Sequence, residues 1–206
     1  MVSKFRSLKR LIYLISPNQI YLNFYIELSK VLSSNKVSFF QLRLKKKSKN
    51  QIIKIAKKIK IITKKYNVKL IINDNPKVTK LVNGDGCHVG QTDATYRVAK
   101  KILKNKTVGV TCHGSKKLIN KAIKNNVDYI ALGSFFRSKL KPNAKKTNKK
   151  IISWTRSKTN IPIVAIGGIN DKNYKNLLNL GANYIAISSF IWNNPALKYK
   201  AAINKF

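Results

Sequence analysis

The chain has 206 residues, of which 44% are hydrophobic, and its 43 basic residues outnumber six acidic ones to give a formal net charge of +37. This length suits one α/β domain, so we expect a single domain over residues 1–206. No apolar run approaches the roughly 18 residues of a membrane span, and the run Leu11–Ile15 is too short for a secretory signal. We therefore expect a cytoplasmic protein with no membrane partner, in which Cys87 and Cys112 are free thiols.

The excess of positive charge raises the question of a nucleic-acid partner. A sequence pI near 10.4 is typical of proteins that bind nucleic acid or anionic membranes. All but six of the basic residues are lysines, however, and they are spread along the chain without an arginine-rich block, zinc-ligand spacing or an aromatic RNA-binding motif. We interpret them as solvated helix faces, which argues against nucleic-acid binding. A basic nucleic-acid-binding protein on a barrel fold stays open as an alternative of another class.

Short apolar runs alternate with longer, lysine-studded segments of helical periodicity along the whole chain. The expected strands are Leu11–Ile15, Val37–Arg43, Lys69–Asn73, Gly86–Val89, Thr107–Thr111, Tyr129–Gly133, Ile163–Ile166 and Tyr184–Ser188. The expected helices are Leu22–Leu32, Gln51–Lys64, Pro76–Val82, Thr95–Leu103, Lys116–Lys124, Lys149–Ser157, Asp171–Leu178 and Pro195–Asn204. This strict alternation predicts a parallel sheet closed into a single (β/α)8 TIM barrel. An open doubly wound sheet would need a glycine-rich turn after its first strand, and residues 16–19 contain no glycine.

Four of the six acidic residues have a local explanation. Glu27 lies within a predicted helix, and Asp85 and Asp128 each precede a predicted strand. Asp171, with Asn170, resembles a helix N-cap.

The other two acids, Asp74 and Asp93, follow the predicted strands Lys69–Asn73 and Gly86–Val89 and flank a glycine-rich segment. In a barrel, active-site residues lie at the carboxyl ends of the strands and in the loops that follow them. Two carboxylates there, completed by diphosphate oxygens and water, form a typical Mg²⁺ site. We therefore expect Asp74 and Asp93 to bind Mg²⁺ and, through it, a diphosphate.

Polar residues and glycines follow nearly every other strand. The polar ones that we expect at the site are Gln41, Arg43, Lys45, Asn73, His88, Gln91, Thr111, Ser138 and Lys141. Gly167-Gly168 and Ser188-Ser189 close the seventh and eighth strands, where barrels commonly bind a phosphate through backbone N–H groups. Taken alone, Gly167-Gly168 is equally consistent with a tight strand-to-helix turn.

Two Cys-His pairs, Cys87-His88 and Cys112-His113, raise the question of zinc. Neighbouring residues of a strand point to opposite faces, so neither pair readily chelates one ion, and no CxxC spacing is present. We expect both cysteines to pack behind the barrel wall and His88 to point into the site.

The order and spacing of these motifs resemble the thiamine-phosphate synthase family over nearly the whole chain. The motifs that carry the resemblance are YLIS at 13–16, FQLRLK at 40–45, IIND at 71–74, DGCHVGQTD at 85–93, VGVTCH at 108–113, DYIALGSFF at 128–136, IPIVAIGGIN at 161–170 and GANYIAIS at 181–188. The resemblance implies a (β/α)8 enzyme that joins 4-amino-2-methyl-5-pyrimidinylmethyl diphosphate to a thiazole phosphate and releases pyrophosphate.

The resemblance also implies roles for individual residues. Asp74 and Asp93 would bind Mg²⁺. The residues that would hold the pyrimidine and its diphosphate are Gln41, Arg43, Lys45, Asn73, Thr111 and Lys141, to which we add His88 and Ser138. Gly168, Ile187 and Ser188 would bind the thiazole phosphate through their backbone amides. The catalytic set would be Arg43, Lys45 and Lys141, which stabilise the charge on the leaving pyrophosphate, together with Thr111.

Some positions depart from the family pattern. Leu44 replaces the acidic residue common in the QxRxK motif, and the loop GSFFRSKLK at 133–141 replaces a pattern of the form GPxFPTxTK. The nearest alternative function is that of the related thiazole tautomerase, which has no diphosphate to ionise and so no need of a two-carboxylate metal site. The oligomeric state stays open, with a homodimer as a candidate.

Overall fold

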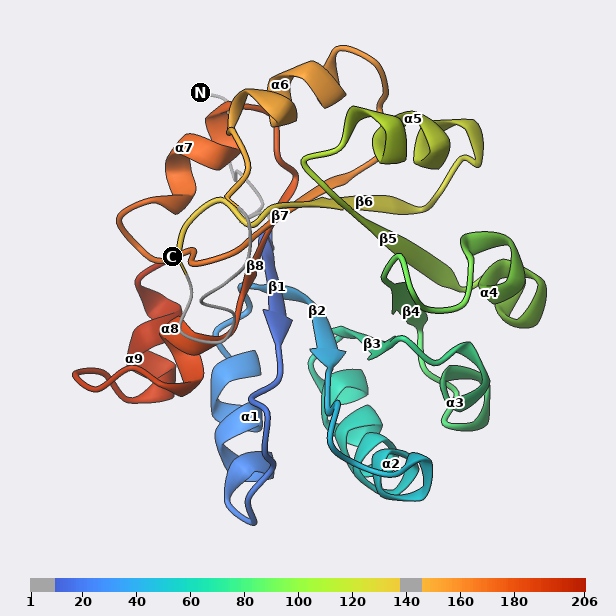
Figure 1. Cartoon of the computed structure of the whole chain (residues 1–206). Coiled ribbons are helices and arrows are strands. Elements are labelled where there is room, and N and C mark those ends of the chain that lie inside the picture. Colours follow the sequence, from blue (N-terminus) through green and yellow to red (C-terminus); the bar gives the residue numbers. More distant parts are fainter. Residues whose placement is uncertain (1–9, 138–145) are drawn as a thin grey trace, which may run out of the picture.

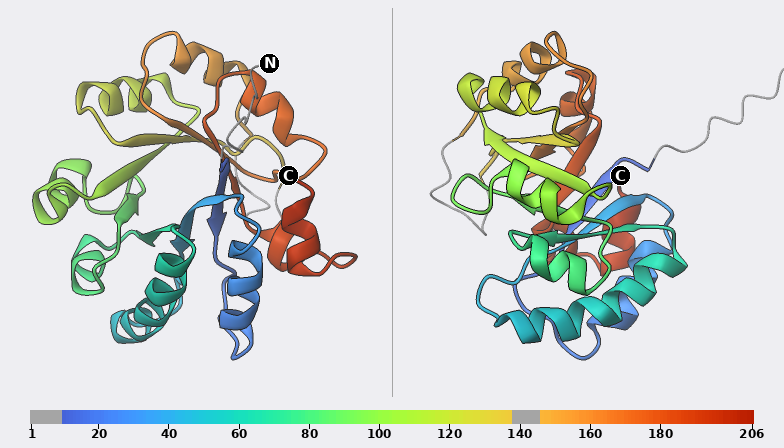
Figure 2. Two further views of the ribbon diagram at one scale, coloured as in Figure 1. Left: turned by 180° about the vertical axis from the view of Figure 1, so that it is seen from behind. Right: turned by 90° about the vertical axis from the view of Figure 1, so that its right-hand side faces the viewer.

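The computed structural model describes residues 10–137 and 146–206, and within them eight parallel strands pair in chain order, with β8 closing on β1. The strands are β1 Ile12–Ile15, β2 Val37–Leu42, β3 Lys69–Asn73, β4 Gly86–Val89, β5 Thr107–His113, β6 Tyr129–Leu132, β7 Ile163–Ile166 and β8 Tyr184–Ile187. The helices are α1 Phe24–Leu32, α2 Lys49–Lys65, α3 Pro76–Leu81, α4 Tyr96–Leu103, α5 Lys116–Lys124, α6 Lys150–Arg156, α7 Tyr174–Asn179, α8 Ser189–Trp192 and α9 Tyr199–Asn204. Figures 1 and 2 show the helices on the outside of the ring of strands. The predicted (β/α)8 barrel is confirmed, and only the one-turn α8 has no counterpart among the predicted helices.

The seventh helix begins later than its sequence pattern predicts. It starts at Tyr174 with Asn173 as its N-cap, three residues beyond Asp171. The side-chain oxygen of Asn170 accepts hydrogen bonds from the backbone N–H groups of Lys172 and Asn173, at 3.0 and 3.1 Å, and so forms the turn that leads into α7. The N-cap role predicted for Asp171 is therefore wrong.

Side-chain caps start several helices soon after a strand ends. Ser48 and Gln51 form a capping box at α2, in which each side chain accepts the backbone N–H of the other residue at 3.3 and 3.0 Å. Asn75 accepts the N–H of Val78 at 3.0 Å, and Pro76 fills the first position of α3. These caps fix the points at which the chain leaves the loops after β2 and β3.

The strands are apolar on both faces and contribute to one cluster inside the barrel and to two clusters between strands and helices. Ile12 and Leu14 of β1 pack with the surrounding helices, whereas Tyr13 and Ile15 belong to a second cluster inside the barrel. That interior cluster comprises Tyr13, Ile15, Ile71, Tyr129, Ala131, Val164 and Ala186, with Phe39, Ile166 and Tyr184 packed against it. Because side chains fill the barrel, ligands are expected at its mouth, where the strands end.

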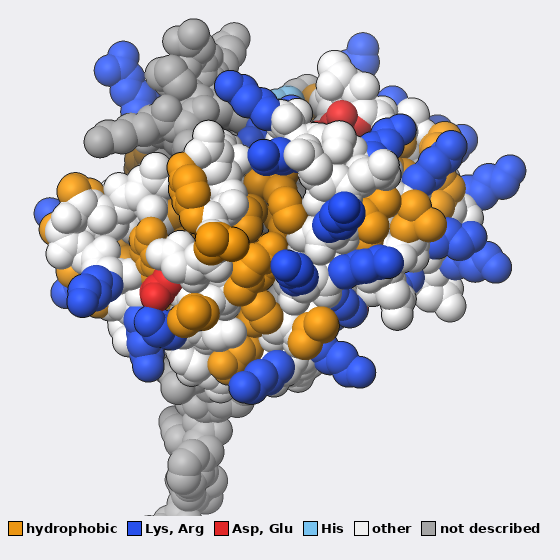
Figure 3. Space-filling model, turned by 90° about the horizontal axis from the view of Figure 1, so that it is seen from below, with side chains coloured by type: hydrophobic (Ala, Val, Ile, Leu, Met, Phe, Trp, Pro, Cys, Tyr) orange, Lys and Arg blue, Asp and Glu red, His pale blue; other side chains and the backbone are white. Residues whose placement is uncertain are grey.

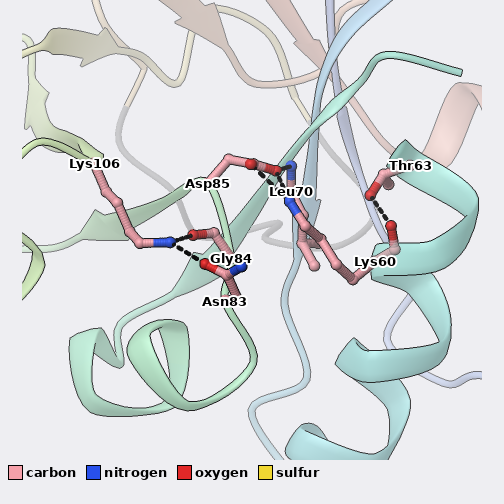
Figure 4. Close-up of polar contacts among 7 residues, drawn as sticks. All are labelled: Lys60, Thr63, Leu70, Asn83, Gly84, Asp85 and Lys106. Atoms are coloured by element: carbon pink, nitrogen blue, oxygen red, sulfur yellow. Dashed lines mark hydrogen bonds and ion pairs between the residues drawn. The ribbon is translucent and has the colours of Figure 1, made fainter. Parts of the chain in front are cut away.

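At the amino ends of the strands, away from the mouth, Asp85 joins three elements. It lies just before β4 and accepts the backbone N–H of Leu70 in β3 at 2.7 Å. It also accepts two hydrogen bonds from the ammonium group of Lys60 in α2, at 2.6 and 2.7 Å (Figure 4). Lys106 donates to Asn83 and to the Gly84 carbonyl beside it, at 2.7 and 2.6 Å.

The same arrangement recurs before β6 and β8. Asp128 accepts the N–H of Val108 in β5 at 2.8 Å and the ammonium group of Lys100 in α4 at 2.8 Å. Asn183 accepts the N–H of Ile163 in β7 at 2.9 Å and a hydrogen bond from Arg156 in α6. In each case the residue just before an even-numbered strand accepts a backbone N–H from the odd-numbered strand that precedes it. The same residue accepts a hydrogen bond from a cationic side chain of the helix that leads into that odd-numbered strand. The local roles predicted for Asp85 and Asp128 are thus confirmed.

Replacing Asp85 by alanine is expected to lower the free energy of unfolding by about 1–3 kcal/mol, because two buried or half-buried donors lose their shared acceptor. Asp85→Asn should cost less, since Asn183 shows that an amide oxygen can accept a strand N–H in this arrangement. Urea unfolding measures both changes. The control is Glu27→Ala, which removes a surface ion pair with Lys30, whose side chain is 54% exposed. Such an exposed pair stabilises a protein by less than about 1 kcal/mol. Equal losses in Asp85→Ala and Glu27→Ala would contradict the bridging role.

None of the helices in the described ranges is long and apolar enough to cross a membrane.

Candidate active site

Four residues predicted at the site lie on four neighbouring strands and at the same end of the barrel. Gln41 is in β2, Asn73 in β3, His88 in β4 and Thr111 in β5, each near the carboxyl end of its strand. Asn73 and His88 are paired in register, and His88 is paired with Gly109, two residues before Thr111. The structure therefore brings these side chains together, as the sequence predicts. Two further predicted site residues, Ser138 and Lys141, lie outside the described residues.

The carboxylates of Asp74 and Asp93 lie together at this end of the barrel. Asp74 directly follows β3 with φ of 62°, and its backbone N–H donates to the His88 carbonyl at 2.7 Å. Asp93 accepts the backbone N–H of Gly90 at 2.8 Å. Burial, followed by contact with the Asp93 carboxyl and its charge, raises the pKa of Asp74 to about 6, although Lys45 and Arg43 oppose the shift. The ammonium group of Lys45 is 3.9 Å from the Asp74 carboxylate.

These residues fit a magnesium ion. Mg²⁺ prefers oxygen ligands and usually combines one or two carboxylates with water and substrate phosphates. Among the described residues no group of three His, Cys, Asp or Glu side chains could hold a metal, so an all-protein cage is absent from that part of the chain. The two carboxylates repel one another, and this repulsion contributes to the raised pKa of Asp74. A divalent cation bound between them would offset the repulsion. A side chain at Gly90 would place its Cβ 2.7 Å from the Asp93 carboxylate, so glycine keeps that carboxylate in place.

A chain of hydrogen bonds crosses the interior of the barrel just below the mouth. Gln41 Nε2 donates to the Tyr13 hydroxyl at 3.0 Å, and the hydroxyls of Tyr13 and Tyr129 are 2.8 Å apart. His88 then bridges Tyr129 and Thr111: Nδ1 is 2.8 Å from the Tyr129 hydroxyl and Nε2 is 2.7 Å from Thr111 Oγ1. Tyr13 and Tyr129 thus contact the predicted site residues Gln41 and His88, and the sequence prediction did not include either tyrosine.

Ser16 was missed as well. It is 3% exposed, its hydroxyl accepts the backbone N–H of Arg43 at 3.0 Å, and its carbonyl accepts the Ser188 hydroxyl at 3.2 Å. Ser16 N–H donates to the Gln41 carbonyl at 2.9 Å. Ser16 therefore joins the end of β2, which carries the predicted diphosphate ligands, to the end of β8, which carries the predicted phosphate amides.

The glycines after β7 serve a close approach of two loops. Gly167 and Gly168 have φ of 106° and 60°, values that favour glycine. A Cβ at Gly167 would lie 2.0 Å from Ser134 Oγ, and one at Gly168 would lie 2.2 Å from the Arg137 carbonyl. The tight turn considered for Gly167-Gly168 is therefore confirmed, and a role in phosphate binding stays a prediction beside it.

Two backbone amides in this region are available to a ligand. Neither the N–H of Gly168 nor that of Ser188 donates to a residue that the structure describes. Ile187 is the last residue of β8, is 2% exposed, and pairs with Leu14 of β1. Gly168 and Ser188 are therefore the better placed of the three predicted phosphate ligands.

The two cysteines are packed in the cores. Cys87 and Cys112 are 0% exposed, and burial raises the pKa of each thiol to about 12. Thiols in that state are poor metal ligands and poor nucleophiles. Leu44, which replaces an acidic residue of the family pattern, is 4% exposed and belongs to the core between strands and helices.

Comparison with known proteins agrees with this geometry. The profile of the family described as thiamine monophosphate synthase matches residues 12–191. A thiamine-phosphate synthase of Pelagibacter ubique is 50% identical over 198 residues, which cover 96% of this chain and 96% of that protein. A thiamine-phosphate synthase of Saccharophagus degradans is 36% identical over 166 residues, covering 80% of this chain and 76% of that protein.

Solved structures give the same result. The thiamine phosphate pyrophosphorylase of Pyrococcus furiosus superposes with a TM-score of 0.85 at 25% identity, covering 96% of this chain and 94% of that chain. Phosphoribosyl anthranilate isomerase of Thermotoga maritima, with a TM-score of 0.69, 15% identity and coverage of 95% and 96%, shares the barrel fold alone. The chain therefore belongs to the thiamine monophosphate synthase family, whose members are transferases.

Proposed function

We propose that this enzyme joins 4-amino-2-methyl-5-pyrimidinylmethyl diphosphate to a thiazole phosphate, forming thiamine phosphate and pyrophosphate. The observation that carries the proposal is the pair Asp74 and Asp93 beside the cation of Lys45 at the barrel mouth. Such a mixture of carboxylates and cations suits a diphosphate that leaves during the reaction, which a phosphate-binding isomerase would not require.

The reaction is a substitution at the methylene carbon of the pyrimidine substrate. The bond from this carbon to the diphosphate oxygen breaks, and its electron pair leaves with pyrophosphate. The thiazole nitrogen then supplies the electron pair of the new C–N bond to the cation that remains. No protein nucleophile takes part, and both thiols of the chain are buried and protonated.

The cations of Arg43 and Lys45 would stabilise the charge that builds on pyrophosphate, together with Lys141. Ser16 holds the backbone of Arg43 in place, since its hydroxyl accepts the Arg43 N–H at 3.0 Å. Removing a fixed charge or donor of this kind commonly costs about 100-fold or more in kcat. Mg²⁺ bound by Asp74 and Asp93 would add neutralisation of the diphosphate charge.

The two substrates would be held on opposite sides of the mouth. The proposed pyrimidine-side residues are Gln41, Asn73, His88, Thr111 and Ser138. The backbone amides of Gly168, Ile187 and Ser188 would bind the thiazole phosphate, which places the thiazole nitrogen for attack. Because both reactants are held in one complex, the attack of the thiazole nitrogen on the pyrimidine cation becomes an effectively unimolecular step.

A coupled assay tests this function. The purified chain is incubated with the pyrimidine diphosphate and the thiazole phosphate, with Mg²⁺ or with EDTA, and thiamine phosphate is measured. We expect product that requires Mg²⁺ and that disappears in Asp93→Ala, but not in the control Glu27→Ala, whose carboxylate pairs with Lys30 on α1. Folded protein without product that instead isomerises a thiazole carboxylate phosphate would indicate the tautomerase, and salt-dependent DNA binding without either activity would indicate the nucleic-acid alternative.

We also propose a single domain over residues 1–206, a cytoplasmic location and a homodimer. Support for a homodimer comes from exposed apolar side chains at and before α1, with Leu22 96% and Ile26 62% exposed. Figure 3 views the side on which α1 and α2 lie and shows hydrophobic side chains between scattered lysines and arginines. On this side of the molecule, the scatter of positive charge supports the view that the lysines solvate the surface rather than form a nucleic-acid-binding face.

A further inference from the structure

The hydrogen-bonded chain inside the barrel connects two residues of the proposed pyrimidine site through two tyrosines. It runs from Gln41 through Tyr13, Tyr129 and His88 to Thr111, with successive separations of 3.0, 2.8, 2.8 and 2.7 Å. Tyr13 and Tyr129 are 2% and 3% exposed, so contact with bulk water does not determine where either hydroxyl hydrogen points. The orientation of each hydrogen in the chain therefore depends on its neighbours.

The donors and acceptors permit one direction for this chain when Gln41 Nε2 faces Tyr13. An amide nitrogen can only donate, so the Tyr13 hydroxyl accepts a hydrogen bond from Gln41 and donates one to the Tyr129 hydroxyl. Tyr129 then donates to His88 Nδ1, and a neutral His88 carries its hydrogen on Nε2 and donates to Thr111. Burial raises the pKa of both phenols well above its usual value, so each hydroxyl keeps the hydrogen that this order needs.

Two groups at the ends of the chain are then left for a ligand. They are the Gln41 side-chain oxygen, which can only accept, and the Thr111 hydroxyl hydrogen, which can only donate. Neither is engaged by a residue that the structure describes. A ligand that donates to Gln41 and accepts from Thr111 matches them, and the amino group and a ring nitrogen of an aminopyrimidine supply such a donor and acceptor.

We propose that Tyr13 and Tyr129 are positioning residues that fix the polarity of Gln41 and Thr111, so that the site selects a 4-aminopyrimidine over its 4-oxo counterpart. The proposal rests on the proposed function. A 4-oxo ring presents an acceptor in place of the amino donor and carries an N–H donor on a ring nitrogen, which is the reverse order. To accept it, the whole chain would have to reverse at once: the Gln41 amide, both phenol hydrogens and the His88 tautomer.

Packing holds the two tyrosines where the chain needs them. The Tyr129 ring stacks on His88, with centroids 5.6 Å apart and planes at 14°. Tyr13 stacks on Phe39 at 5.4 Å and 27°. A Cβ at Gly109 would lie only 1.9 Å from the Tyr129 ring, so a glycine in β5 provides the space that this ring occupies. These contacts restrict both hydroxyls to the line between Gln41 and His88.

The test compares Tyr129→Phe and Tyr13→Phe with a matched control, Tyr184→Phe. Tyr184 packs against Phe39 at 5.1 Å in the same interior cluster, but its hydroxyl makes no hydrogen bond to a described residue. Steady-state assays with the 4-amino substrate and with its 4-oxo analogue give kcat and KM for each enzyme. In Tyr129→Phe and Tyr13→Phe we expect the 4-amino over 4-oxo preference in kcat/KM to fall at least 10-fold, with KM for the thiazole phosphate unchanged within about twofold. The double variant should cost little more than either single one, since each breaks the same chain.

A measurement without turnover checks the direction of the chain independently. The chain has two histidines, so ¹⁵N spectra of His88 can be assigned by comparison with His113→Gln. We expect His88 to carry its hydrogen on Nε2 in the unmodified protein, and a mixture of tautomers in Tyr129→Phe but not in Tyr184→Phe. A hydrogen on Nδ1 in the unmodified protein would overturn the proposal whether or not thiamine phosphate is formed. Active protein in which Tyr129→Phe keeps the 4-amino preference of Tyr184→Phe would overturn it while leaving the proposed function intact.

Discussion

Asp74→Asn is expected to lower kcat by at least 100-fold and, without magnesium, to make the folded chain more stable than the unmodified protein. Activity falls because the proposed metal site loses one of its two carboxylates. Stability rises because burial and the neighbouring Asp93 carboxyl disfavour a charge at Asp74, as its pKa of about 6 indicates. Asparagine is the suitable replacement, since it tolerates the φ of 62° at this position. Urea unfolding in EDTA should show a gain of about 1–3 kcal/mol at neutral pH.

The gain should depend on pH in a defined way. A carboxyl whose folded pKa is raised binds more protons in the folded than in the unfolded state between about pH 4 and pH 6. The free energy of unfolding of the unmodified protein therefore falls over this window as pH rises. Above about pH 6 the loss caused by the charged Asp74 stays constant. The difference between Asp74→Asn and the unmodified protein should grow from pH 4 to pH 6 and then level off.

Magnesium should reverse the order of stability. The ion stabilises the unmodified protein by mass action and has little effect on Asp74→Asn. Glu27→Gln removes the carboxylate that pairs with Lys30 on α1 and serves as the control, with no expected change in activity or in the response to magnesium. A metal-free Asp74→Asn protein that is less stable than the unmodified one at pH 7 would show that the two carboxylates do not repel one another.

The scarcity of acidic residues is what made the carboxylate pair predictable. Once Asp85 and Asp128 have a place before strands, Asp74 and Asp93 stand out at strand ends, and barrel topology brings such ends together. In the structure Asp85 and Asp128 hold strand N–H groups and lysines at the opposite end of the barrel. The strand boundaries were predictable for the same kind of reason, because short β-branched runs bounded by polar turns leave little choice of register.

The hydroxyl network was not predictable, because its members look like ordinary core residues. Tyr13 and Tyr129 occupy inward positions of apolar strands, where a tyrosine is as consistent with packing as with hydrogen bonding. The two hydroxyls meet across 116 residues, and Ser16 meets Ser188 across 172. Such contacts depend on the closure of the barrel and the depth at which each side chain ends, which no local pattern records. The pair Gly109 and Tyr129 is the signal that remains, since a glycine within a strand indicates that a large side chain approaches.

The departures from the predicted helices are the late starts of α7 and of α9, which begins at Tyr199 rather than Pro195, and the unpredicted one-turn α8. Asn170 and Asp171 are both good N-caps by residue type, and only the contacts of Asn170 with the following N–H groups decide that the helix begins later. α8 is a single turn of four residues and is too short to show helical periodicity. Its first residue follows Ser188, so this unpredicted turn also determines where the Ser188 amide lies.

Gly168→Ala is expected to raise KM for the thiazole phosphate at least 10-fold while changing KM for the pyrimidine diphosphate by no more than about twofold. The added Cβ would lie 2.2 Å from the Arg137 carbonyl and 2.8 Å from Phe136 Cβ, so either the turn after β7 or the segment Ser134–Arg137 must move. Movement of the turn displaces the Gly168 amide, and one misplaced donor to a phosphate costs about 1.5–3 kcal/mol, enough for this change in KM.

The matched control for this change is Gly181→Ala. Gly181 also has a positive φ, 107°, but it precedes β8 at the far end of the barrel, where a Cβ would meet only the flexible side chain of Arg156 at 3.2 Å. Both variants suffer backbone strain and should lose stability in urea unfolding, whereas only Gly168→Ala should lose affinity for the thiazole phosphate. If both lose stability and neither changes that KM, the glycines after β7 serve loop packing alone, and the phosphate must be held by other groups at the mouth. If the two KM values rise together in Gly168→Ala, the displaced segment Ser134–Arg137 contributes to the pyrimidine side as well.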